Sequence, residues 1–139
     1  MAQENAIGVD IGGTKIAAGV VDASGRILAR RRRDTDPLRP GAIEDAVVDV
    51  VNGLRDEFEV AAVGVAAAGF VSDDRGTVLF APNIAWRDYP LRGRLAPFID
   101  LPVVVENDAN AAGWAEFRFG AGRDVADMAM VTVGTGLGG

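Results

Sequence analysis

Three polar residues, Glu106, Asn107 and Asp108, follow the apolar run 103–105 and precede the alanine-rich stretch 109–119. A carboxylate in this position could accept the proton of an attacking alcohol, while neighbouring amides orient other hydroxyl groups. An Asn or Asp before an alanine-rich helix is also typical of a helix cap. Both interpretations stay open, because one side chain can cap the helix while another faces a ligand at the end of a buried strand.

A glycine-rich turn lies in the stretch VDIGGTKIAAGVVD, between predicted strands at 7–10 and 15–22. Gly12 and Gly13 could adopt positive φ, so that successive backbone N–H groups point into one concavity and bind phosphate oxygens. An ordinary glycine hairpin turn on the surface explains the same residues equally well.

Three side chains beside this turn fit a phosphate site. Thr14 would add a hydroxyl donor and Lys15 a positive charge. Asp10, at the end of the first strand, could hold a water molecule of a magnesium ion that bridges nucleotide phosphates.

The segment MVTVGTGLGG, residues 130–139, repeats the pattern of a strand, glycines and a threonine, here Thr135 and Gly136. Two such elements, far apart in the chain, suggest two hairpins that hold a polyphosphate from opposite sides. The alternative is an ordinary glycine-rich segment.

Two further residues are candidate ligand contacts on weaker sequence evidence. Asn83 follows Pro82 in APNIAW and offers an amide, although a simple turn residue is the plainer interpretation. Gly69 follows the apolar run 60–67 and either brings backbone close to a ligand or ends the strand.

The elements that position these residues alternate in a β-β-β-α-β-β-α-β-α-β order. The predicted strands are 7–10, 15–22, 26–33, 60–67, 77–80, 102–107 and 127–133. The predicted helices are 41–59, 91–99 and 109–119, the second of them bent or ended near Pro97. Short turns make the first three strands an antiparallel meander. The runs 60–67 and 102–107 are typical of strands covered on both faces. The sequence predicts an α/β fold with a mixed sheet and helices on its faces, not a dinucleotide fold that begins βαβ.

Composition excludes several classes of function. The chain has 139 residues and a net charge of −6, which disfavours nucleic acid as a partner. Cys and His are absent, which excludes disulfides, Cys/His zinc sites and histidine catalysis within these residues. The arginine-rich stretch 26–35 is best explained as an edge strand. We expect a cytoplasmic protein without membrane contact, because no signal peptide and no apolar run of ~20 residues is present.

The stretches VDIGGTKIAAGVVD, APNIAW, VVVENDANAAGWAEFRFGAG and VTVGTGLGG resemble, in order and spacing, the ROK sugar kinases. Among these kinases the chain is most similar to the actinobacterial-type ATP-dependent glucokinases. The resemblance implies a ribonuclease-H-like, actin-type fold of two lobes. Residues 1–122 would form the N-terminal lobe, and residues 123–139 the first strand and phosphate turn of a second lobe.

The resemblance also implies transfer of the γ-phosphoryl group of ATP to the 6-hydroxyl of glucose, with Mg²⁺, at the entry to glycolysis. Asp108 would be the general base, and Asp10 would bind magnesium through water. The implied sugar contacts are Asn83, Asn107 and Asp108, with Gly69 as a further candidate. The implied phosphate contacts are Asp10, Gly12, Gly13, Thr14, Lys15, Thr135 and Gly136.

The chain departs from the family in length. Family members are roughly twice as long, and their second half carries a His and a Glu for the sugar, a structural zinc motif and the adenosine pocket. We therefore expect an N-terminal portion with little activity by itself. A homodimer is common among relatives, but nothing in these residues demonstrates it.

Four alternatives remain. The first two are a ROK kinase for another hexose and a polyphosphate-using glucokinase. A sugar-binding ROK transcriptional regulator is disfavoured, because its helix-turn-helix would precede a phosphate loop that here lies within the first 15 residues. A non-sugar actin-like ATPase is disfavoured by ENDANAA.

Overall fold

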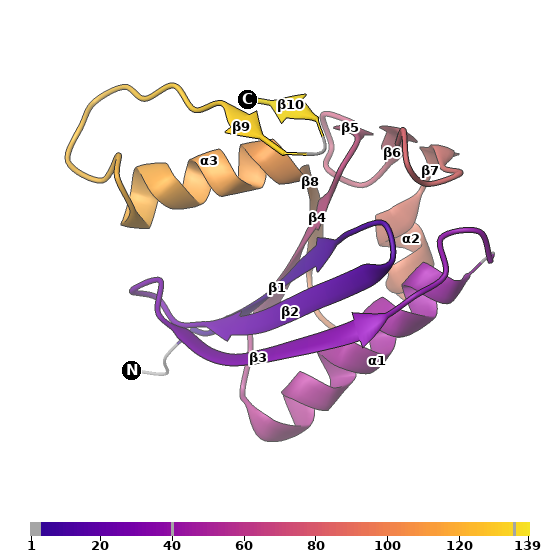
Figure 1. The fold of residues 1–139 in the computed structure, drawn as a ribbon. Helices are drawn as coiled ribbons and strands as arrows, with labels where there is room; N and C mark the ends of the chain where they lie inside the picture. The colour runs from indigo at the N-terminus through magenta and orange to yellow at the C-terminus, as the bar shows by residue number, and fades with distance from the viewer. Residues whose placement is uncertain (1–3, 40, 135) are drawn as a thin grey trace.

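A five-stranded mixed sheet forms the centre of the fold (Figure 1). The computed structural model describes residues 4–39, 41–134 and 136–139. The strand order is β3-β2-β1-β4-β8. Strands β3, β2 and β1 are antiparallel neighbours, whereas β1, β4 and β8 run parallel. The bounds are Ala6–Ile11 for β1, Lys15–Val21 for β2, Ile27–Asp34 for β3, Ala62–Ala67 for β4 and Val103–Asn107 for β8. The predicted meander and mixed sheet are confirmed.

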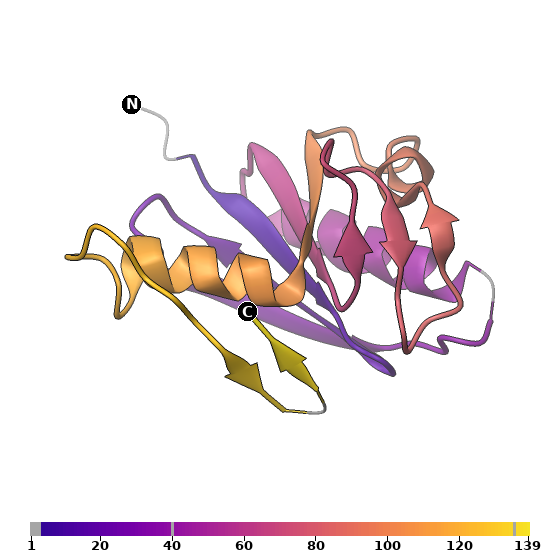
Figure 2. The same ribbon diagram turned by 90° about the horizontal axis from the view of Figure 1, so that it is seen from above.

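Helices lie on both faces of this sheet. Helix α1 (Ala42–Glu57) packs beneath β1, β2 and β3, with α2 (Leu91–Leu95) beside it under β8. Helix α3 (Asp108–Phe119) follows β8 directly and lies over the opposite face (Figures 1 and 2). The junction between β8 and α3 lies at the end of the sheet where the parallel strands β1, β4 and β8 finish.

Helix α1 forms as the apolar spacing predicts. Its buried positions recur every three or four residues, and its first turn carries Glu44 and Asp45, whose charges suit the helix dipole. The chain enters through Gly41, which has φ 78°, and leaves through an extended Phe58. No helix in the described ranges has the length and apolar character needed to cross a bilayer.

The apolar core lies between the sheet and helices α1 and α2, and strands β1, β2 and β4 bury every second residue against it. Helix α3 lies over the second face without closing on it: Gly64 and Val104 line a cavity beneath the helix and stay exposed, so the prediction that β4 and β8 are covered on both faces is wrong. On that side β4 carries glycine and alanine. Both count as apolar, so the sequence of β4 looked like a continuous apolar run. Side chains on the open face of the sheet are therefore accessible to ligands or other chain segments.

Smaller elements differ in part from the prediction. Helix α2 ends at Leu95, close to Pro97, where the sequence predicted a bend or an end within 91–99. Three short antiparallel strands, β5 (Phe70–Val71), β6 (Val78–Phe80) and β7 (Arg87–Tyr89), form a second sheet where one strand was expected.

The last predicted strand, 127–133, is mostly irregular. Only β9 (Thr132–Val133) is strand, and it pairs with β10 (Leu137–Gly138) as a hairpin. The division into a lobe of residues 1–122 and the start of a second lobe stays a prediction.

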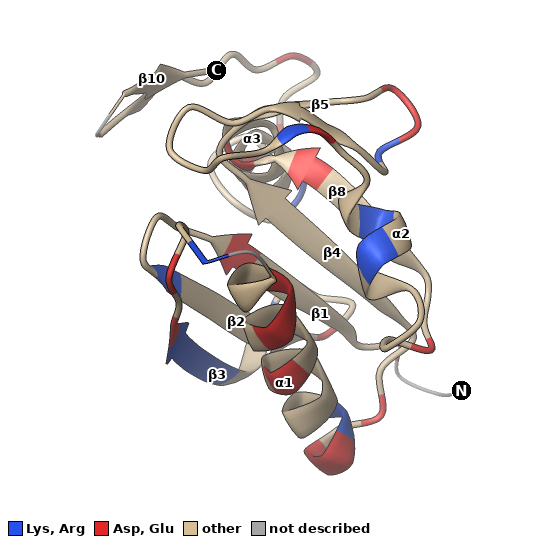
Figure 3. Cartoon of the chain, turned by 90° about the vertical axis from the view of Figure 1, so that its right-hand side faces the viewer, with Lys and Arg blue, Asp and Glu red and all other residues tan. Residues whose placement is uncertain are grey.

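The arginine-rich strand β3 forms the edge of the main sheet, as predicted. Its arginines form a continuous basic stretch along this edge (Figure 3). Arg31 and Arg33 reach α1, where they pair with Glu57 and Asp49, the latter at 2.8 Å. These pairs explain part of the basic cluster without any nucleic-acid partner.

Candidate active site

The parallel strands β1, β4 and β8 bring two acidic residues to the same level of the open face. In the strand register Asp10 pairs with Ala66, and Ala66 pairs with Glu106. Paired residues of parallel strands point to the same face, so both carboxylates project from it. Their Cα atoms lie two strand spacings apart, about 10 Å. Figure 3 shows the acidic residues at the ends of β1 and β8.

Asp108 lies beside this pair, as the first residue of α3. Its side chain is exposed, and its Oδ1 accepts the Ala109 N–H at 2.9 Å. Partial loss of hydration, and secondly the charge of Asp108, raise the pKa of Asp10. The residues predicted as general base and metal ligand therefore lie close enough to interact electrostatically.

Asn107 is the N-cap of α3, which confirms the capping interpretation for this residue. Its Oδ1 accepts the Asn110 N–H at 3.1 Å, and its Nδ2 donates to the Gly69 carbonyl at 2.8 Å. One N–H of Nδ2 and one lone pair of Oδ1 remain for a ligand. The cap thus also fixes the orientation of an amide next to Asp108.

The backbone of the chain itself explains why residue 69 is a glycine. A Cβ atom at this position would lie 2.5 Å from the Phe80 carbonyl oxygen of β6. The close approach that the sequence suggested is therefore to β6, and the carbonyl of Gly69 serves as the acceptor for Asn107.

The first glycine turn is a tight β1–β2 hairpin. The Gly12 N–H donates to the Lys15 carbonyl at 2.9 Å, and a Cβ on Gly12 would lie 2.9 Å from that oxygen. Positive φ occurs at Gly25 and Gly41 among the described glycines, so the expected positive φ at Gly12 and Gly13 is wrong. Gly12 thus shapes the turn, and its N–H is already engaged.

The remaining groups of this turn face solvent. Gly13, Thr14 and Lys15 are exposed. The side chains of Thr14 and Lys15 have no hydrogen-bond or ion-pair partner within the described part of the chain. A hydroxyl and an ammonium group are therefore available at the tip of the hairpin.

The second glycine turn joins β9 and β10, with Gly134 N–H donating to the Gly136 carbonyl at 3.0 Å. Thr135 lies outside the described residues. A Cβ at Gly138 would lie 2.8 Å from the Cβ of Ala109, so this hairpin is seated on the first turn of α3. Both glycine turns point to the same side of the molecule (Figures 1 and 2).

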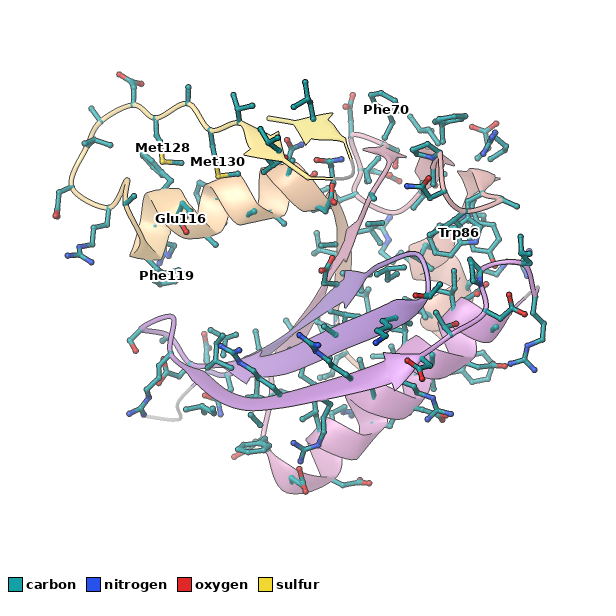
Figure 4. The ribbon with its side chains drawn as sticks, in the orientation of Figure 1. Phe70, Trp86, Glu116, Phe119, Met128 and Met130 are labelled. Carbon is teal, nitrogen blue, oxygen red and sulfur yellow. The ribbon has the colours of Figure 1, made fainter. Side chains whose placement is uncertain are left out.

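The far end of α3 is also anchored. Phe119 projects from α3 toward the sheet (Figure 4), where a Cβ on Gly25 would lie 2.7 Å from its ring. Met128 and Met130 point from the following segment onto the outer side of the helix (Figure 4). The helix that carries Asp108 is thereby held at both ends.

Asn83 is not joined to the other candidates. It lies exposed on the turn between β6 and β7, and its side chain makes no hydrogen bond among the described residues. The neighbouring Trp86 is buried and stacks on Tyr89 with ring centroids 4.9 Å apart, which fixes this turn (Figure 4). Its role as a sugar ligand stays a prediction.

One residue with a structural link to the site, Arg75, escaped the sequence analysis. Its Nε lies 3.6 Å from Oε2 of Glu106. The stretch DDRG that contains Arg75 reads as a surface turn. No signal in the sequence connects it to Glu106.

The donor chemistry beside Asp10 fits a magnesium ion that is bound together with substrate phosphates. Within the described ranges, no three His, Cys, Asp or Glu residues are clustered as a metal cage. Magnesium commonly binds through one or two carboxylates together with substrate phosphates and waters. Asp10, whose pKa is raised beside Asp108, supplies such a carboxylate.

A family profile and curated relatives both place the chain in one protein family. The profile of the ROK family matches residues 6–139. The chain is 55% identical over 133 residues to a glucokinase of Streptomyces coelicolor, a match that covers 96% of this chain and 42% of the relative. The chain therefore spans less than half the length of this curated relative.

Two solved structures share the fold. One is a ROK family glucokinase from Streptomyces griseus in complex with glucose and AMPPNP, with TM-score 0.90, 56% identity, and coverage of 96% of this chain and 43% of that chain. The other is an inorganic polyphosphate/ATP-glucomannokinase from Arthrobacter sp. strain KM, with TM-score 0.86, 38% identity, and coverage of 97% and 56%. These matches confirm the predicted fold class.

Proposed function

This chain belongs to the ROK family, and on that premise we propose that the protein containing it is an ATP-dependent glucokinase. The reaction is transfer of the γ-phosphoryl group of ATP to the 6-hydroxyl of glucose. The observation that carries the proposal is the position of Asp108, at the start of α3, beside Asp10 and the seat of the β9–β10 hairpin. Similarity to a glucokinase solved with glucose and AMPPNP supports the choice of sugar and nucleotide.

Asp108 is the proposed general base. Its carboxylate is exposed and accepts the N–H of Ala109 through Oδ1, which leaves Oδ2 for a sugar hydroxyl. The free N–H of Asn107 would orient a neighbouring hydroxyl, and Asn83 would supply a second amide. Gly69 acts on the sugar through Asn107, whose amide it holds.

The two glycine turns are the proposed phosphate contacts. Thr14 and Lys15 offer a hydroxyl and an ammonium group from the first turn, together with the Gly13 backbone. Thr135 and Gly136 would act from the second turn. Positioning and charge neutralisation dominate phosphoryl transfer, because its transition state is loose.

Asp10 is the proposed magnesium residue, acting through a bound water. Magnesium, when bound, neutralises charge on the oxygens of the transferred phosphoryl group. Burial and, secondly, the charge of Asp108 raise the pKa of Asp10, and a cation bound nearby would favour its ionised form.

We also propose a cytoplasmic location and a role at the entry to glycolysis. Dimerisation and a structural zinc ion outside this chain, both expected from the resemblance, stay predictions.

The test is a coupled kinase assay of the full-length protein with a panel of hexoses and with ATP or polyphosphate as donor. We expect glucose with ATP to give the highest kcat/KM. Phosphorylation of no hexose would overturn the proposal. A preference for another hexose, or for polyphosphate, would replace it by the corresponding ROK kinase.

A further inference from the structure

Arg75 adopts a backbone conformation that is unusual for its residue type. Its φ is 56°, in the left-handed region where glycine and asparagine are favoured. The turn around it is fixed, because the Arg75 N–H donates to the Ser72 carbonyl at 2.9 Å and the Asp74 Oδ1 accepts the Gly76 N–H at 3.1 Å. Local strain of this kind is retained when the surrounding structure needs it.

Both the backbone and the side chain of Arg75 contact β8 immediately before Asp108. Its carbonyl accepts the Val105 N–H at 2.9 Å, and its guanidinium Nε lies 3.6 Å from Glu106 Oε2. One turn residue therefore contacts two successive residues of the strand that leads into α3.

The other oxygen of Glu106 continues this connection into the helix. Oε1 accepts the backbone N–H of Asn107 at 2.8 Å and the Nδ2 donor of Asn110 at 3.3 Å. Asn107 is the N-cap directly before Asp108, and Asn110 follows Asp108 in the first turn of α3. Movement of the Glu106 carboxylate would shift both neighbours of Asp108.

We propose that Arg75 and Glu106 are positioning residues, whose ion pair holds the first turn of α3 so that Asp108 meets the sugar hydroxyl. This inference rests on the glucokinase activity proposed above. In this proposal the pair acts through the start of α3 and not by contact with the substrate.

A role in stability alone is a poor explanation for the pair. The side chains of Arg75 and Glu106 are 62% and 29% exposed, and exposed ion pairs add little to the free energy of unfolding. A misplacement of a catalytic group, in contrast, lowers turnover strongly even when the fold is intact.

The experiment uses the full-length protein and four variants of the pair. Arg75→Gly suits the left-handed backbone and keeps the carbonyl that Val105 needs, while it removes the guanidinium. Glu106→Gln keeps the acceptor oxygen and removes the charge. The double variant and Arg75→Lys complete the set. For each variant we would measure kcat, KM for glucose, KM for ATP and amide hydrogen exchange of residues 107–110.

A matched control separates backbone effects from the ion pair. Asp88 is the other described non-glycine residue with positive φ, at 48°, and lies on β7. Asp88→Gly relieves the same kind of strain without touching Glu106. We expect its kcat and its exchange at residues 107–110 to match those of the wild-type protein.

We expect Arg75→Gly and Glu106→Gln each to lower kcat about tenfold with KM for ATP unchanged, and the double variant to be no worse. Arg75→Lys should restore part of the lost turnover, and Arg75→Gly should speed exchange of the Asn107 and Asn110 amides. Wild-type kcat in Arg75→Gly, or losses that multiply in the double variant, would overturn the proposal.

The exchange measurement separates this inference from the proposed function. If the wild-type protein phosphorylates no hexose, the proposed function fails. Faster exchange in Arg75→Gly then still supports the pair as the element that holds the α3 turn, whereas unchanged exchange overturns it.

Discussion

The charge of Asp108, at the first residue of α3, contributes to raising the pKa of Asp10 at the end of β1. Two carboxylates that chain order separates by almost a hundred residues thus form one electrostatic unit. Neither has an ion-pair partner among the described residues. Such a pair favours a site that operates with a bound cation.

Asp10→Asn should stabilise the folded protein at neutral pH. The pKa of Asp10 is raised in the folded state above its ordinary value of 3.8, so its ionised form is disfavoured there. The stability that this shift provides is complete below the unfolded pKa and is lost as pH rises through the folded pKa. The variant should therefore match the wild-type protein in acid and exceed it at pH 7, as measured by urea unfolding across this range. A stability difference that does not change with pH would contradict the assignment.

The same variant should have lower kinase activity at a given magnesium concentration, because the proposed water contact to magnesium is removed. Its activity should need a higher magnesium concentration than that of the wild-type protein, as a magnesium titration would measure. An unchanged magnesium requirement would remove Asp10 from the metal site.

Asp108→Asn should lower kcat by ~10²–10⁴-fold, because the amide cannot accept the proton of the 6-hydroxyl. The Ala109 N–H keeps its acceptor in the amide oxygen, so we expect an unchanged fold and only modestly weaker glucose binding. Steady-state kinetics and glucose titration measure the two effects. Near-normal turnover would exclude Asp108 as the base.

Asn107→Ser should separate the capping role from the amide role. Serine caps a helix about as well as asparagine, but it cannot hold the Gly69 carbonyl. We expect a loss of about 1 kcal/mol in unfolding free energy and a raised KM for glucose. Asn107→Ala should lose a further ~1 kcal/mol with the cap. Equal stability of the two variants would contradict the capping contribution.

Gly69→Ala should destabilise the protein by about 1–3 kcal/mol, because its methyl group meets the Phe80 carbonyl at 2.5 Å. Gly53→Ala is the matched control, since Gly53 is exposed in α1 and a Cβ there meets nothing within 4 Å. This control should gain up to about 1 kcal/mol. Chemical unfolding of both variants measures the change in unfolding free energy. An unchanged unfolding free energy in Gly69→Ala would show that β6 can shift.

The sequence was informative where a local pattern determines the structure. Helix α1, the antiparallel meander and the Asn107 cap follow from spacing and residue type, and the structure confirms each. Asp10 and Glu106 lie at the same level because their parallel strands end at the same side of the sheet.

The remaining features depend on contacts that no local pattern encodes. The open face of β4 was missed because Gly64 and Ala66 count as apolar although they face outward. Strands β5 and β7 are too short to show alternation. Arg75 could not be linked to Glu106, because their contact depends on how the turn after β5 packs against the edge of β8.

The close contact between Gly138 and Ala109 has a consequence for protein engineering. Both ends of the connection between α3 and β9 are fixed, one by the helix itself and the other by this contact. Lengthening such a connection adds only a small entropic term, about 0.6 kcal/mol for each doubling. A reporter peptide spliced in after Asp124 would thus leave the spacing between Asp108 and the second glycine turn intact, which makes this bend a suitable position for a fused sensor.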